Sequence, residues 1–303
     1  MPLLIPSREI KLTTRTGVSV NRTLPHRELK MIGPWCFVDH FGPTEQTDGM
    51  VVAAHPHTGL QTVTWLLEGA IEHRDSIGSV QHISPGQLNL MTAGHGIAHS
   101  ELSLTETKRL HAVQLWVALP DAARNVAPAF EHRDDLPVVL GSDWQATILV
   151  GEFLGQQAAT KAFSPMVGVE LRLEPNTEFR VQAAVGYEYG FLNVEGSFAV
   201  NGADVPLSGL YYLSSGEVDA EIVLKSGQSG AILLILGGEP FGEPILMWWN
   251  FIARTQADIS QMREQWNRHR EDPAASARFG SFPDQIGGWI PAPELPSVKL
   301  HAR

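Results

Sequence analysis

The chain has 303 residues, and at about 150 residues per domain this length predicts two domains that need no disulfide bonds. Hydrophobic residues make up 43% of the chain and charged residues 18%, a globular composition that excludes intrinsic disorder. The net charge of −11 (22 Lys plus Arg against 33 Asp plus Glu) argues against direct binding to nucleic acid or to an anionic membrane.

The single cysteine, Cys36, excludes an intramolecular disulfide and indicates a reducing compartment. The apolar stretch at residues 1–5 is too short for a signal peptide. The most apolar later run, residues 231–236, is far shorter than the ~20 residues of a membrane helix. We therefore expect a cytoplasmic monomer, or a nuclear one if the source is eukaryotic.

Most of the chain is predicted as short strands. The runs richest in β-branched, aromatic and aliphatic residues are residues 61–67, 112–118, 146–150, 167–173 and 231–236. Gly, Pro, Asn and Ser separate these runs at close intervals. This pattern predicts an all-β sandwich or barrel.

One helix is predicted over residues 255–270. Thr255 and Asp258 have the spacing of a capping box, and Ile259, Met262 and Trp266 then share one face. We expect that face to pack on the barrel rather than to bind a partner. The Pro- and Gly-rich tail after residue 273 is interpreted as an extended strap or a loose terminus.

A faint repeat agrees with two domains. Residues 65–70 and 192–197 both contain a strand-like run that leads into Glu-Gly, which we expect to be a turn. We therefore predict an N-terminal domain over 1–155 and a C-terminal domain over 156–303, the latter including the helix and the tail.

Eight of the 12 histidines lie between His40 and His111. His55 and His57 are two residues apart, as are His99 and Glu101, so in strands each pair projects from one face. A single His-x-His pair is usually only structural, but the two pairs together favour a metal site of three nitrogen donors and one oxygen donor. This set, which lacks sulfur, leaves open positions on a first-row divalent metal: Fe(II), Mn, Ni, Cu or Zn.

His95 lies between Gly94 and Gly96, and we expect these glycines to allow positive φ or a close approach of the backbone. His95 itself either lines a cavity entrance or fills a turn, and turn statistics favour the turn. His40 is expected to hydrogen-bond within the barrel. His73 has no paired partner in the sequence and is interpreted as structural.

Several segments together resemble the pirin family of the cupin superfamily. Residues 55–69 and 91–101, with Pro85-Gly86 between them, are similar to the two metal motifs of pirins. Further similarity lies in Gly33-Pro-Trp-Cys-Phe-Val-Asp-His-Phe-Gly-Pro43, in residues 238–244 and in residues 247–251. The resemblance extends over residues 8–282.

The resemblance implies a bicupin: two double-stranded β-helix (jelly-roll) barrels with a short C-terminal helix. It also implies a mononuclear metal in the N-terminal barrel, commonly iron and hence Fe(II), on His55, His57, His99 and Glu101. Many pirins show quercetin 2,3-dioxygenase activity, in which a flavonol reacts with O2 and CO is released, and we expect Glu101 to accept the substrate proton. Other pirins are redox-sensitive interaction proteins, so the alternative is a metal sensor that regulates a protein partner.

The chain also departs from the family. Gln61 stands where pirins usually have glutamate, and its position in the strand allows either a place beside the metal or a structural role. In the second module, the position equivalent to His55 is Gln182, and no His-x-Glu follows. The second barrel is therefore predicted to hold no metal.

Overall fold

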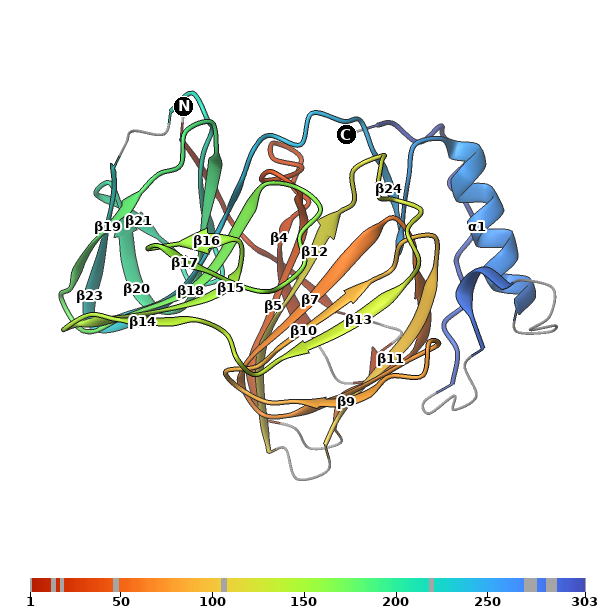
Figure 1. Ribbon diagram of the computed structural model, residues 1–303, viewed down its shortest axis with the longest axis horizontal. Coiled ribbons are helices and arrows are strands. Elements are labelled where there is room, and N and C mark those ends of the chain that lie inside the picture. The colour runs from red at the N-terminus through yellow and green to blue at the C-terminus, as the bar shows by residue number, and fades with distance from the viewer. Residues whose placement is uncertain are drawn as a thin grey trace. The chain divides into compact units, whose positions relative to one another are not determined.

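The computed structural model describes residues 2–11, 15–16, 19–45, 49–104, 108–217, 221–269, 277–281 and 288–302 (Figure 1). The chain forms two compact units that interleave along the sequence. Unit 1 comprises Met1–Ile10, Val20–His40 and Arg133–Phe241, and unit 2 comprises Lys11–Ser19, Phe41–His132 and Gly242–Arg303. The predicted boundary at residues 155 and 156 stays a prediction, while the C-terminal helix lies in unit 2, together with residues 41–132.

Unit 1 is built on an antiparallel sheet whose strands follow the order β1-β22-β20-β23-β18-β15-β14, with β19 paired to β23 and β21 paired to β20. Its strands are β1 (Leu3–Ile5), β14 (Val138–Leu140), β15 (Trp144–Val150), β18 (Met166–Leu173), β19 (Glu178–Gln182), β20 (Glu188–Val200), β21 (Ala203–Val205), β22 (Leu210–Leu213) and β23 (Glu221–Gly238). A short hairpin joins β16 (Glu152–Phe153) and β17 (Gln156–Gln157). The interior is filled with apolar side chains such as Phe191, Val169 and Ile235. Three predicted strand runs, 146–150, 167–173 and 231–236, lie in β15, β18 and β23 respectively.

Near the start of unit 1, β2 (Arg8–Lys11) and β4 (Ser19–Leu24) precede β5 (Trp35–Glu45), and β4 pairs antiparallel with β5. Both nitrogens Nε and Nη2 of Arg22 donate to the carboxylate of Asp39, at 2.6 and 2.7 Å. His40 Nδ1 lies 2.8 Å from Ser208 Oγ, so His40 hydrogen-bonds within unit 1, to a residue outside the predicted domain 1–155. Cys36 is buried, as expected for a small apolar side chain.

The carboxylate of Glu188 is a second polar centre of unit 1. It accepts hydrogen bonds from the backbone N–H of Gly33 and from the hydroxyl of Tyr212, the latter at 2.6 Å. Burial, together with this bond to the charged carboxylate, raises the pKa of Tyr212 far above its ordinary value.

The second half of the predicted repeat differs from our expectation. Glu68 ends its strand and Gly69 follows with positive φ, but Glu195 and Gly196 lie inside β20. There the register to β23 shifts, so the segment forms a bulge instead of a turn. Gly196 permits this because its φ is +74° and a Cβ would lie 2.2 Å from the carbonyl oxygen of Gly230.

Unit 2 contains two antiparallel sheets, which include the predicted strand runs 61–67 and 112–118. One has the order β13-β10-β7-β12 and continues to β5, and the other has the order β3-β6-β11-β8-β9. The strands are β3 (Arg15–Thr16), β6 (Val51–His57), β7 (Leu60–Glu68), β8 (Ile71–Asp75), β9 (Val80–Ile83), β10 (Leu88–Thr92), β11 (Ile97–Ser103), β12 (Arg109–Ala118) and β13 (Ala129–Arg133). A hairpin of β24 (Leu246–Trp248) and β25 (Phe251–Ala253) leads into the helix.

The predicted helix is α1 (Gln256–His269), drawn in blue in Figure 1. Its capping box is present: Asp258 N–H donates to Thr255 Oγ1, and Thr255 N–H donates to Asp258 Oδ2. The apolar face packs into one cluster with Phe251 of β25 and Ala98 of β11, as expected. Residue 270, the last of the predicted helix, lies outside the described residues.

The C-terminal tail, after the short 3-10 helix η2 (Ala277–Phe279), lies along β6 as a strap. Ile290 N–H donates to Ala54 O at 2.9 Å, and Trp266 Nε1 donates to Ile290 O at the same distance. The rings of Trp266 and Trp289 stack with centroids 3.5 Å apart. The described part of the tail is therefore ordered by β6 and α1. No described helix has the length and apolar character that crossing a membrane requires.

Candidate metal centre

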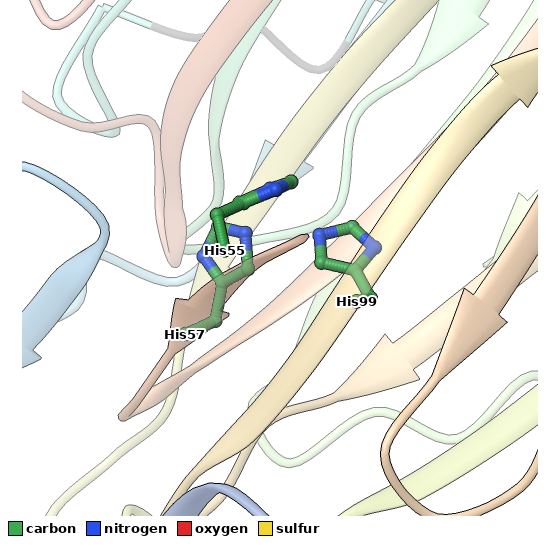
Figure 2. A group of neighbouring side chains, drawn as sticks. All are labelled: His55, His57 and His99. Atoms are coloured by element: carbon green, nitrogen blue, oxygen red, sulfur yellow. The ribbon is translucent and has the colours of Figure 1, made fainter. Parts of the chain in front are cut away.

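Three histidine rings meet between the neighbouring strands β6 and β11. His99 lies directly opposite His55 in the antiparallel register, and His57 follows on the same face of β6. The ring centroids are 4.3 Å apart for His55 and His99, and 5.0 Å from His57 to each of the other two. Figure 2 shows the three imidazoles gathered together. Each offers a nitrogen within 4.8 Å of the others, and all three side chains are buried.

Neighbouring groups hold two of these rings. His55 Nδ1 lies 2.8 Å from the carbonyl oxygen of Ala53, to which it must donate because a carbonyl only accepts. That bond fixes the tautomer in which His55 Nε2 carries the lone pair needed for a metal. The ring of His57 packs edge-on against Trp116 of β12, with centroids 5.0 Å apart.

Glu101 belongs to a second group of potential ligands. It is buried, and its Oε1 accepts a hydrogen bond of 3.3 Å from Thr64 Oγ1. Its carboxylate groups with His99 and His73, so the structure contains two overlapping sets of potential ligands that share His99. The assignment of all four residues, His55, His57, His99 and Glu101, to one metal therefore stays a proposal.

His73 is the residue that sequence reasoning missed. It faces Glu101 across the β8–β11 pair, while Asp75 faces His99, and all four side chains are buried. The signal was present as His73-x-Asp75, the same two-residue spacing as His99-x-Glu101. His73 therefore does have a partner at this spacing, and its interpretation as a structural residue stays a prediction.

Gln61 and His95 are two further candidates for places near the metal. Gln61 is buried and its Nε2 donates to Thr92 Oγ1 at 3.0 Å, across the β7–β10 pair. His95 lies in a turn and is held through its backbone, because its N–H donates to Val126 O and its carbonyl accepts from Arg278 Nη1. A role for either side chain beside the metal stays a prediction.

The glycines on either side of His95 have the positive φ and the close backbone contacts that were expected. Gly94 has φ of +51°, and a Cβ there would lie 2.0 Å from the carbonyl oxygen of Val126. At Gly96 a Cβ would meet Arg278, with its Cγ at 2.6 Å and its carbonyl oxygen at 2.7 Å. The turn that leads into His99 therefore depends on glycine at both positions.

The donor set fits a first-row divalent metal. Neutral imidazole nitrogens and one carboxylate suit Fe, Mn, Ni, Cu or Zn. A group of three protein ligands leaves coordination positions on the metal open for further molecules. Both sets of potential ligands lie in unit 2. In unit 1, Gln182 is exposed and donates to Glu221 at 3.2 Å.

The family models agree with this architecture. Residues 17–117 match the Pirin family and residues 168–272 match the pirin C-terminal cupin domain. The chain belongs to the pirin family, and its fold is that of an all-β bicupin with one short C-terminal helix.

Individual relatives support the same conclusion. A crystal structure of quercetin 2,3-dioxygenase from Acinetobacter baumannii is 42% identical, with a TM-score of 0.92 over 99% of this chain and 97% of that one. A Pseudomonas aeruginosa protein named "Putative quercetin 2,3-dioxygenase" is 42% identical over 92% of this chain and 87% of its own. A pirin-like protein of Caulobacter vibrioides is 34% identical over 91% and 94% of the two chains.

Proposed function

We propose that this pirin is a metal-dependent dioxygenase that cleaves quercetin-like flavonols with O2 and releases CO. The observation that carries the proposal is the buried group of His55, His57 and His99. The names of the 42% identical relatives, one from Acinetobacter and one from Pseudomonas, support the substrate class. Fe(II) is the metal that we propose, held by these three histidines together with Glu101.

The metal, when bound, would bring the flavonol and O2 together and so remove much of the entropic cost of their meeting. The chain's own residues supply the rest. The three imidazoles are neutral ligands, so they leave the positive charge of the centre available to a deprotonated substrate hydroxyl. We propose that the carboxylate of Glu101, which accepts a hydrogen bond from Thr64, takes up the proton of the substrate hydroxyl.

The test compares the wild type with two histidine variants. His57→Ala removes a member of the buried group, whereas His82→Ala removes a histidine whose side chain is 59% exposed and outside it. Each protein is loaded with Fe(II), its metal content is measured, and quercetin is supplied under O2. We expect the wild type and His82→Ala to retain metal, bleach quercetin and release CO, and His57→Ala to lose both metal and turnover.

Equal turnover in His57→Ala would contradict the proposal, as would a metal-loaded wild type that leaves quercetin unchanged. In the second case the alternative, a metal- or redox-sensing protein that regulates a protein partner, becomes the better hypothesis.

A further inference from the structure

A buried chain of polar groups leads from the end of β8 to the histidine cluster. His73 Nε2 lies 3.1 Å from Asp75 Oδ2, and His73 Nδ1 lies 3.4 Å from His99 Nδ1. All three side chains are less than 5% exposed. The His73 ring is also stacked on Phe130 of β13, with centroids 4.5 Å apart and planes 17° apart. The ring is thus held between Asp75 and His99.

The hydrogen-bond partners decide where the protons lie. Asp75 Oδ1 accepts from the backbone N–H groups of Ile77 and Ser79, so Oδ2 is the carboxylate oxygen that faces His73. This carboxylate oxygen accepts the bond, so His73 carries its proton on Nε2. In the neutral ring this leaves a lone pair on His73 Nδ1.

The same logic continues into His99. Since His73 Nδ1 accepts, His99 must donate from its own Nδ1, and the lone pair of His99 then lies on Nε2. We propose that Asp75 and His73 are positioning residues, which fix the tautomer and the orientation of His99 so that its Nε2 is ready to bind a metal. The proposal rests on the metal site proposed above, but it does not depend on the dioxygenase activity.

An isosteric change separates this role from a purely structural one. Asp75 Oδ1 accepts from the N–H groups of Ile77 and Ser79, at 3.0 and 2.9 Å, and so shapes the turn after β8. In Asp75→Asn, the amide oxygen keeps these two bonds, which directs the NH2 group toward His73. His73 Nε2 must then accept, His73 Nδ1 must donate, and the proton of His99 moves to Nε2, where it blocks the metal.

The first measurement uses metal-free protein with ¹⁵N-labelled histidine, at a pH where the rings are neutral. Long-range ¹H–¹⁵N NMR correlations report which ring nitrogen carries the proton. We expect His73 protonated on Nε2 and His99 on Nδ1 in the wild type, and both exchanged in Asp75→Asn. A wild type with His99 protonated on Nε2 would overturn the proposal, whether or not the protein later proves to be a dioxygenase.

The second measurement is metal affinity, determined with Fe(II) or Co(II) against a competing chelator. Loss of a group that orients a ligand typically costs 10–100-fold in affinity, and we expect Asp75→Asn to fall in this range. The control is Glu72→Gln on the same strand: Glu72 bonds to Arg74 and His82, and the change is expected to alter affinity less than about twofold, since Glu72 is not among the potential ligands.

His73→Phe completes the design and keeps the test decisive if Asp75→Asn folds poorly. It preserves the ring that stacks on Phe130 but removes the nitrogens that link Asp75 to His99. We expect it to weaken metal binding to a similar degree, and Asp75→Asn to add nothing to it in the double variant. Wild-type affinity in His73→Phe, or a full extra effect of Asp75→Asn in that background, would overturn the proposal.

Discussion

Gly94→Ala is expected to destabilise unit 2 much more than Gly86→Ala, although both glycines have positive φ. Gly94 has φ of +51° and Gly86 has φ of +84°, so each alanine incurs the cost of left-handed backbone, about 1–2 kcal/mol. A Cβ at residue 86 meets nothing within 4 Å, whereas one at residue 94 would lie 2.0 Å from Val126 O. The comparison therefore isolates the effect of crowding.

The additional loss of stability in Gly94→Ala comes from a hydrogen bond that the new methyl group would break. His95 N–H donates to the same Val126 oxygen at 3.0 Å, and pushing that oxygen away leaves a backbone donor without its partner. Losing such a bond costs about 1–3 kcal/mol. For a domain of this size, each kcal/mol of lost stability lowers the melting temperature by roughly 2–4 °C. Gly94→Ala should therefore melt several degrees below Gly86→Ala.

The assay is thermal unfolding of both variants as metal-free protein, followed by circular dichroism and tryptophan fluorescence. Metal is omitted so that an altered affinity at His99 does not enter the comparison. Equal melting temperatures for the two variants would refute the argument, because they would show that the backbone at Val126 accommodates a methyl group without loss.

Two other predictions concern stability. Trp266→Ala should lower the free energy of unfolding of unit 2 by about 3–5 kcal/mol in urea titrations, because this fully buried ring stacks on Trp289 and fills the space beneath α1; a loss below about 1 kcal/mol would contradict that account. For Tyr212, whose pKa is raised in the folded state, the stabilisation should be fully present below the unfolded value of about 10 and decline as the pH rises above it. Tyr212→Phe should flatten this alkaline decline, and an unchanged slope would show that Tyr212 does not cause it.

The histidine cluster could be predicted because strand geometry is local. Residues two apart share a face, so His55 and His57 had to project together, and only the pairing of their strand with that of His99 remained to be supplied. The same rule places His73 and Asp75 on one face of their strand, which is the neighbour of the strand with His99.

Long-range packing could not be predicted from local sequence patterns. The capping box of Thr255 and Asp258 located the start of α1, but nothing local states that the helix belongs with residues 41–132. That placement comes from contacts such as Trp266 with the tail and Phe251 with Phe279, which depend on the whole unit. Similarly, the bulge at Gly196 lies where β20 pairs with the distant strand β23 on both sides of a register shift, which no local pattern indicates.

The strap formed by the C-terminal tail has a consequence for the order in which the protein is made. The strand with His55 and His57 leaves the ribosome well before its backbone neighbour at Ile290 and before helix α1. The largest segment of unit 1, Arg133–Phe241, emerges in between, whereas its segments Met1–Ile10 and Val20–His40 emerge before that strand. Although N-terminal segments generally fold first during synthesis, unit 2 can be completed only after α1 and the strap have been translated. A nascent chain halted before residue 242 would carry all three histidines of the cluster without the hydrophobic cluster that α1 completes.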